Sequence, residues 1–194
     1  MVTAFVIPFR LFFVMTDYRD TLQGPHQPGL EPSTQFLRSD ELRRGAEFLF
    51  LAARTLAAQE EDQLATAGFG PAHGRALFMI HQHEGLSVSE LMQLLGITKQ
   101  SLSRVLENLE AAELIKRSPD AIDGRVRRLY LTPEGKRFEE SLFQGASAML
   151  SKAYGAVGQQ AVGHLWQTLL YLIDPESRDL LFSDLSKNSP SNSR

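Results

Sequence analysis

The sequence predicts a mainly α-helical fold with a single small β-hairpin. Apolar residues recur at spacings of three and four through residues 39–57, 71–83, 88–95 and 99–109, which is the pattern of amphipathic helices. Residues 114–131 instead contain two extended runs separated by Pro, Asp and Gly, which is typical of a hairpin. A chain of 194 residues with 43% hydrophobic residues is long enough to form one well-packed core.

Composition limits the kinds of function that are open to the chain. Because it has no cysteine, disulfides, thiolate metal sites and a cysteine nucleophile are excluded. No apolar run is long enough to cross a bilayer, so we expect no membrane partner and a cytoplasmic location. The formal net charge is −3, yet residues 98–137 hold nine Lys and Arg against six Asp and Glu. Basic charge is therefore concentrated in one segment, as phosphate binding requires.

The two ends are expected to lie outside the packed domain. Residues 1–34 are predicted to be a flexible leader, because an apolar run without signal-peptide flanks leads into a Gly- and Pro-rich stretch. Met15 is a candidate native start, which would make residues 1–14 a non-native extension. Residues 186–194 are polar and lack periodicity, so we expect a disordered tail. One domain is predicted over residues 35–185.

Two helices are predicted before the basic segment. The first begins at Ser39 and is stopped by Gly68 and Gly70. It is apolar around so much of its circumference that its own domain or a second chain must cover more than one side. Pro71 begins the next helix, which runs to about His83. Both helices are expected to pack on the core.

A helix-turn-helix pattern follows. Ser87 and Glu90 form a capping box at the start of one helix. That helix ends at Gly96, and Thr98 is a suitable N-cap for the next helix. Two helices joined by a short glycine turn are the outline of a motif that places its second helix in the major groove of DNA.

The second helix of this motif has an apolar face from Leu102 to Leu109 and an opposite face of groove-reading residue types. Arg can donate two hydrogen bonds to guanine, Gln and Asn can pair with adenine, and Ser, Thr and Lys reach base edges or phosphates. Taken alone, such a helix is also consistent with a surface helix whose polar face is merely solvated. The neighbouring segments must therefore decide between this alternative and a DNA-reading helix. The candidate major-groove residues are Thr98, Lys99, Gln100, Ser101, Ser103, Arg104 and Asn108.

The predicted hairpin supplies that context, because it is basic and follows the helix directly. Its strands cover residues 114–117 and 126–131, and Thr132 is a suitable N-cap for a long helix after it. An arginine projected from such a wing can enter the narrow minor groove. Charge for solubility is the alternative explanation. The candidate wing residues are Arg125, Arg127 and Arg128.

From Leu86 to Gly135 the chain resembles the DNA-binding domain of the MarR family of bacterial transcription regulators. The matching features are the capped helix, the turn at Gly96, the runs TKQSLSRVL and LIKR, the wing sequence DGR and the run LTPEG. Flanking helices extend the resemblance over residues 39–174, and the runs ELRRG and GITKQSL are similar to an alphaproteobacterial type within the family. The DNA-binding core is placed at residues 71–135.

The resemblance implies a winged helix-turn-helix domain flanked by N- and C-terminal dimerisation helices. It implies that Asp123 braces arginines at the base of the wing while Arg125 enters the minor groove. Many relatives are released from DNA by small anionic or aromatic ligands, and His73 and Arg75 lie near where such an effector pocket would be. Gly155, Gly158 and Gly163 depart from the family pattern within the last long helices.

We therefore expect a homodimer that binds double-stranded DNA at an inverted repeat, with repression favoured over activation. The alternative is a winged-helix module whose wing and third helix bind another protein. No catalytic residue is expected, because the chain lacks a Gly-rich phosphate loop and a His-Glu-x-x-His run. Neither a cofactor nor a metal is expected, since His81 and His83 point to different sides of their helix.

Overall fold

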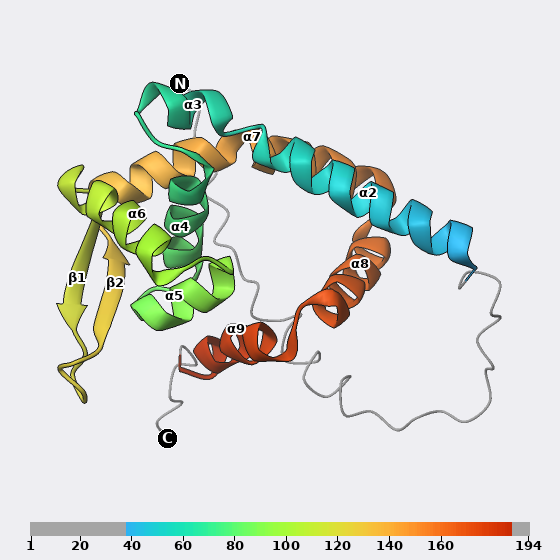
Figure 1. Cartoon of the computed structure of the whole chain (residues 1–194). Coiled ribbons are helices and arrows are strands. Elements are labelled where there is room, and N and C mark those ends of the chain that lie inside the picture. The colour runs from blue at the N-terminus through green and yellow to red at the C-terminus, as the bar shows by residue number, and fades with distance from the viewer. Residues whose placement is uncertain (1–37, 188–194) are drawn as a thin grey trace, which may run out of the picture. The chain divides into compact units, whose positions relative to one another are not determined.

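The computed structural model describes residues 38–187, with side chains through residue 181. It confirms the predicted fold class, because helices dominate and the two strands form one antiparallel hairpin. The chain divides into two units, residues 1–47 and 48–194, and each is described by itself. The elements are α2 (Ser39–Ala57), α3 (Glu61–Thr66), α4 (Pro71–Gln82), α5 (Val88–Leu95), α6 (Lys99–Ala111), β1 (Ile115–Pro119), β2 (Arg127–Leu131), α7 (Pro133–Val157), α8 (Gln159–Leu172) and α9 (Pro175–Lys187) (Figure 1).

The predicted ends fall mostly beyond this range. The leader over residues 1–34 lies outside the described residues, as do residues 188–194 of the predicted tail. Helix α9 runs to Lys187, so the first two residues of that tail are helical. A cap marks its start, because Asp174 Oδ1 accepts a hydrogen bond from Ser177 N at 2.9 Å and Pro175 occupies the first helical position.

The expectation of one helix from Ser39 up to Gly68 is wrong, because the chain turns after Ala57 and begins the separate helix α3. The polar run over residues 59–63 offers no apolar side chain that could continue the face of α2. The turn brings Leu64 into the core, where it is 1% exposed. Burial of this leucine thus takes precedence over helix continuity.

Helices α4, α5 and α6 pack around a common core that also contacts β2 and α7. Each buried leucine or isoleucine contributes roughly 1.5–3 kcal/mol to folding. The apolar face predicted for the helix after Thr98 is buried as expected. The largest fully buried side chains are Leu64, Leu77, Ile80, Leu91, Leu102, Leu106, Leu109 and Leu129.

The predicted helix starts of the helix-turn-helix are confirmed by their hydrogen bonds. Ser87 Oγ accepts from Glu90 N at 3.2 Å, and Glu90 Oε2 accepts from Ser87 N at 2.7 Å. Gly96 ends α5 in the left-handed region at φ +60°. Thr98 Oγ1 then accepts from Ser101 N at 3.2 Å and caps α6.

The wing is tied to the segment before α5 by an isolated antiparallel bridge, with Ser87 opposite Arg128, that the sequence pattern did not predict. β1 and β2 pair antiparallel, with Arg117 opposite Leu129. Gly85 N donates to Leu129 O at 3.0 Å, and Leu129 N donates to Leu86 O at 2.9 Å. Gly85 has φ +85°, and a Cβ there would lie 3.3 Å from the Tyr130 hydroxyl, so this connection needs glycine.

Helix α7 starts tightly against the hairpin. Thr132 Oγ1 accepts from Gly135 N at 2.9 Å, as its predicted role as N-cap requires, and its hydroxyl donates to Glu113 O at 2.7 Å. A Cβ at Gly135 would lie only 1.9 Å from Leu114 O. Only glycine at this position therefore allows the start of α7 to lie this close to the backbone at Leu114.

The glycines that depart from the family pattern have different consequences. Gly158 ends α7 with φ +82°, whereas Gly155 stays inside α7 and Gly163 inside α8. The Trp166 ring packs edge-on against Tyr154 across the joint, with 6.3 Å between ring centroids. Only one of the three glycines interrupts a helix within the described residues.

Several helices leave large apolar side chains uncovered. α2 has 19 residues and not one of them is buried. Scattered exposed leucines are ordinary, but a contiguous apolar surface needs a covering partner. The exposed large apolar residues of α2, α7 and α8 within residues 48–172 are Phe48, Leu49, Phe50, Leu51, Phe143, Val157, Leu165, Tyr171 and Leu172.

Candidate DNA-binding interface

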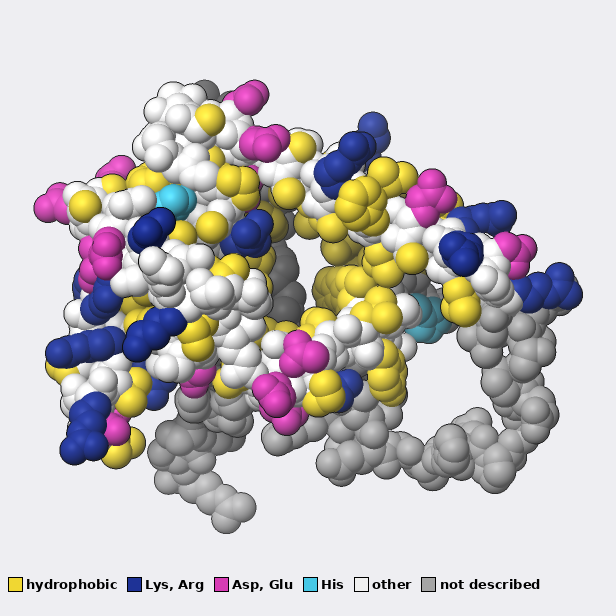
Figure 2. Space-filling model, in the orientation of Figure 1, with side chains coloured by type: hydrophobic (Ala, Val, Ile, Leu, Met, Phe, Trp, Pro, Cys, Tyr) yellow, Lys and Arg dark blue, Asp and Glu magenta, His cyan; other side chains and the backbone are white. Residues whose placement is uncertain are grey.

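The polar side of α6 is exposed. The side chains of Lys99, Gln100 and Arg104 form no hydrogen bond or ion pair with any residue that the structure describes. Gln100 and Arg104 are four residues apart, so they lie one above the other on the same side of the helix. Figure 2 shows Lys and Arg side chains gathered over α6 and the wing. This surface offers donors that are free to contact a partner.

Three other predicted groove residues of α6 have partners inside the helix. The Thr98 hydroxyl donates to Ser101 Oγ at 3.0 Å, so both groups take part in the N-cap. Ser103 is half-buried and donates to Glu107 Oε1 at 2.8 Å. The exposed hydroxyls of the cap remain within reach of a phosphate at the helix N-terminus, a position that favours negative charge.

Asn108, at the far end of α6, contacts His73 of α4. Asn108 Nδ2 lies 3.3 Å from His73 Nε2, and His73 Nδ1 accepts from Gly70 N at 3.1 Å. Burial lowers the pKa of His73, so the neutral ring that can accept this bond predominates at neutral pH. His73 was expected in a ligand pocket. Its ring instead accepts a hydrogen bond from the N-cap residue of α4 and contacts Asn108 of α6.

The carboxylate of Asp120 organises the turn of the wing. Its Oδ1 accepts from Ile122 N at 2.8 Å and Asp123 N at 3.0 Å, and its Oδ2 accepts from Arg128 Nε at 2.6 Å. These bonds, that from Asp123 first, lower the pKa of Asp120 to about 2. The stabilisation is present above the ordinary pKa of the group and is lost as the pH falls towards 2.

Arg128 links that turn to the helix-turn-helix. Its Nη1 lies 3.2 Å from Gly85 O and 3.3 Å from Glu90 Oε2, in addition to the bond with Asp120. The hydrogen bond that Arg128 donates to Asp120 raises the pKa of the guanidinium further. Arg128 was expected to contact DNA, but its side chain is 27% exposed and is held by three acceptors. It therefore acts as an internal brace of the wing.

Asp123 does not brace an arginine side chain, which is the role that the resemblance implied. Its Oδ1 accepts from the backbone N of Arg125 at 2.9 Å, and it forms no ion pair with an arginine among residues 38–187. The bracing carboxylate is that of Asp120, which sequence reasoning missed. An Asp at the start of a Gly-containing turn, three residues before a second Asp, is the signal that could have identified it.

Arg125 and Arg127 keep their guanidinium groups exposed and unpaired with the described residues. They follow the turn directly, and Figure 2 shows Lys and Arg side chains over the wing as well as over α6. The wing thus has two free arginines whose backbone is held in place by a third. Exposed guanidinium groups at such a tip suit the negative potential of the minor groove.

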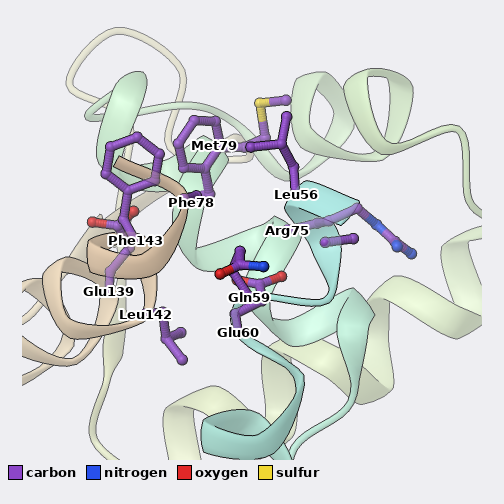
Figure 3. A pocket seen from close by; sticks show the side chains of 12 residues that line it. Leu56, Gln59, Glu60, Arg75, Phe78, Met79, Glu139, Leu142 and Phe143 are labelled. Atoms are coloured by element: carbon purple, nitrogen blue, oxygen red, sulfur yellow. The ribbon is translucent and has the colours of Figure 1, made fainter. Parts of the chain in front are cut away.

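A separate small cavity of about 200 Å³ lies between the end of α2, α4 and α7 (Figure 3). The rings of Phe78 and Phe143 line it, with 5.7 Å between their centroids. Arg75, one of the two predicted pocket residues, lines the cavity, whereas His73 does not. Aromatic walls with a few charged groups are typical of sites for small ligands.

The lining of this cavity contains two carboxylates besides the guanidinium of Arg75. Glu139 is buried and pairs with His81, and burial raises its pKa. Burial also raises the pKa of Glu60, while Arg75 acts in the opposite direction and the charge of Glu139 raises it further. The cavity therefore has more acidic than basic groups in its lining.

Two negative findings apply to residues 38–187. No three His, Asp or Glu side chains in this range come together so that they could hold a metal ion. No helix in the same range is long and apolar enough to cross a membrane.

Comparison with known proteins connects this geometry to a family. Residues 67–126 match the MarR family. The chain is 38% identical over 143 residues to the HTH-type transcriptional regulator PetP of Rhodobacter capsulatus, an alignment that covers 74% of this chain and 86% of PetP. The relatives found are transcription regulators and not enzymes.

Solved structures agree on the fold. Staphylococcus aureus MepR in its DNA-binding conformation has 22% identity and a TM-score of 0.58, covering 66% of this chain and 95% of that one. A MarR-family regulator from Silicibacter pomeroyi has 25% identity and a TM-score of 0.57, covering 66% of this chain and 86% of its own. The winged-helix arrangement is thus shared with proteins of this family.

Arg127 and Arg128 are adjacent, and their different environments allow a matched test. Arg128→Gln should lower the free energy of unfolding by about 1 kcal/mol, because Asp120 and Glu90 lose a shared cation. Arg127→Gln should leave it unchanged, since Arg127 is exposed and unpaired. Urea denaturation measures both effects, and hydrogen exchange at the Ile122 amide reports the order of the wing. Equal unfolding midpoints for the two variants would contradict the bracing role.

Proposed function

Because the chain belongs to the MarR family of transcription regulators, we propose that it acts as a homodimer on an inverted-repeat operator. The observation that carries this proposal is the exposed, unpaired row of Lys99, Gln100 and Arg104 on a firmly capped helix beside a braced basic wing. In the proposed complex, α6 of each protomer enters one of two successive major grooves about one helical turn apart. Two-fold symmetry of the protein then requires two-fold symmetry of the operator.

Within each half-site, different side chains are proposed to contact the bases, the phosphates and the minor groove. Gln100 and Arg104 contact base edges, because amide and guanidinium groups match the donor and acceptor patterns of adenine and guanine. Thr98, Lys99 and Ser101 contact phosphates near the N-terminus of α6. Arg125 enters the flanking minor groove, and Arg127 adds attraction to the backbone. Asn108 contributes mainly by holding α6 against α4 through His73.

Repression is the proposed effect on transcription. A dimer that covers two major grooves and the flanking minor grooves excludes polymerase from the same DNA by simple occupancy. Activation would require a further surface that recruits polymerase. The DNA contacts themselves would be the same in both cases.

The three proposed base and groove contacts can be separated by mutation. Gln100→Ala and Arg104→Ala should each weaken binding by about 1–3 kcal/mol and relax the sequence preference at particular base pairs. Arg125→Ala should weaken binding and reduce the dependence of log Kd on log salt concentration, because a phosphate-proximal charge is lost. Affinities are measured by gel shift or fluorescence anisotropy on an operator recovered by selection from genomic fragments.

Lys152→Ala is the matched control for these variants, because it removes an exposed cation of α7 far along the sequence from α6 and the wing. It should bind as the parent does. If Gln100→Ala, Arg104→Ala and Arg125→Ala also bind as the parent does, α6 and the wing are not the DNA-binding surface.

The dimer is proposed to form through the apolar surfaces of α2, α7 and α8. None of the residues of α2 is buried within a single chain, although Leu49 and Phe50 lie close together on its apolar side. Apolar surface that a monomer leaves exposed is the usual mark of a subunit interface.

Leu49→Arg should therefore convert the dimer into a monomer, because a charge in the middle of an apolar interface is costly to desolvate. Loss of the second half-site contact should weaken operator binding by at least about tenfold. Sedimentation and gel shift report these two effects, and circular dichroism checks that the helices persist. Glu47→Ala, on the polar side of α2, should remain a dimer. A dimeric Leu49→Arg protein with unchanged affinity would rule out this interface.

A small-molecule effector is proposed to bind the cavity between the end of α2, α4 and α7. The carboxylates of Glu60 and Glu139 disfavour binding of an anionic ligand. The rings of Phe78 and Phe143 can stack on an aromatic ligand. A flat aromatic cation gains both from the carboxylates and from the ring faces. The proposed ligand class is thus cationic or neutral aromatic compounds.

Benzamidine and benzoate form a pair of probes that differ in charge on the same ring. Benzamidine should bind and raise the melting temperature, because ligand binding to the native state stabilises it. Benzoate should bind more weakly. Glu60→Gln should reduce benzamidine binding, whereas Glu61→Gln, an exposed neighbour outside the cavity, should not. Calorimetry would contradict the assignment if benzoate bound as tightly as benzamidine.

A further inference from the structure

The tip of the wing has an apolar side chain that takes no part in the fold. Ile122 lies in the turn between β1 and β2, and 99% of its surface is exposed. The turn uses only its backbone, whose N–H donates to Asp120 Oδ1 at 2.8 Å. Gly, Asn, Asp and Ser are the usual residues of such turns, and an exposed isoleucine forgoes the free energy of burial. Folding therefore does not account for isoleucine at this position.

The turn that presents Ile122 is held by hydrogen bonds on both sides. Asp120 N donates to Val126 O and Val126 N donates to Asp123 O, each at 2.9 Å. The carboxylate of Asp123 accepts from Arg125 N, also at 2.9 Å. A side chain on such a pre-organised loop loses little conformational freedom when it binds.

The surroundings of Ile122 combine apolar and cationic groups. Arg125 and Arg127 are exposed nearby in sequence and have no side-chain partner among the described residues. Figure 2 shows hydrophobic atoms at the end of the wing next to Lys and Arg side chains. The minor groove of DNA has matching chemistry, because its walls are sugar C–H groups and its potential is negative.

We propose that Ile122 enters the minor groove beside Arg125 and wedges against a base step at the outer edge of each half-site. This inference rests on the proposed function, because it requires the wing to lie on DNA. Apolar wedges partly unstack the base step that they contact. TA and CA/TG steps unstack most easily. Ile122 therefore sets a sequence preference outside the bases that α6 contacts.

The first test compares affinities of the full chain for an operator recovered by selection. Ile122→Ala should bind about tenfold more weakly, because truncation removes three carbons of a partly buried contact. Ile122→Leu, which keeps the apolar volume, should stay close to the parent. Ala121→Ser, an exposed neighbour in the same turn, is the control and should bind as the parent does. All three should unfold at the parental urea concentration, since Ile122 touches nothing in the fold.

The second test detects the wedge itself. Operator duplexes with 2-aminopurine at the flanking step should become more fluorescent when the parent binds, because unstacking relieves quenching. Ile122→Ala should give a much smaller increase at saturating protein. Replacing a flanking TA step by AA should weaken binding of the parent and have little effect on Ile122→Ala.

The outcomes separate the wedge from the proposed function. If Ile122→Ala matches the parent in affinity and fluorescence while Arg125→Ala loses affinity, the wing binds DNA and the wedge is wrong. If the parent selects no DNA at all, both proposals fail. Unchanged DNA binding by Ile122→Ala, together with loss of a protein that the parent binds, would assign the tip to a protein partner and overturn the wedge.

Discussion

The proposed DNA-binding surface depends on the hydrogen bonds of the Arg128 guanidinium. This group joins the carboxylate of Asp120 in the wing turn, the carboxylate of Glu90 at the start of α5 and the carbonyl of Gly85. Each of these groups also has a local task, since Glu90 caps α5 and Asp120 closes the turn. The wing and the helix-turn-helix are therefore positioned by one shared charge, and neither can move without breaking bonds in the other.

This brace explains why adjacent arginines differ in function. Alternation along β2 places Arg127 on the face of Leu129 and Leu131, but at the turn end of the strand, where its side chain stays exposed. Arg128 lies on the other face, where Asp120 and Glu90 accept its hydrogen bonds. The side chain of Arg128 is bonded within the fold, whereas that of Arg127 stays available together with that of Arg125. A wing held in this way can present exposed groups without paying for their ordering on contact. The structural role of Arg128 is thus a condition for the recognition role proposed for Arg125 and Arg127.

Local signals in the sequence were sufficient for the helix starts, whereas contacts between distant segments were not. Ser87, Thr98 and Thr132 cap their helices through residues three positions away, so short motifs identify them. The bond of Arg128 to Asp120 and the contact of His73 with Asn108 depend on how the elements pack, and no spacing rule encodes them. The break after Ala57 belongs to the second kind, because burial of Leu64 decides it.

Helix α4 stands between the cavity and the DNA-binding surface. Gly74, Arg75 and Phe78 line the cavity, and His73, the preceding residue, supports the end of α6 through Asn108. Glu60 packs closely against α4 at Gly74, because a Cβ at Gly74 would lie 2.7 Å from a carboxylate oxygen of Glu60. A ligand that displaced Glu60 would change a contact of α4, the helix that supports α6 through His73. If the proposed effector site is correct, control of DNA binding from the cavity needs no long path, since α4 lies against both the cavity and α6.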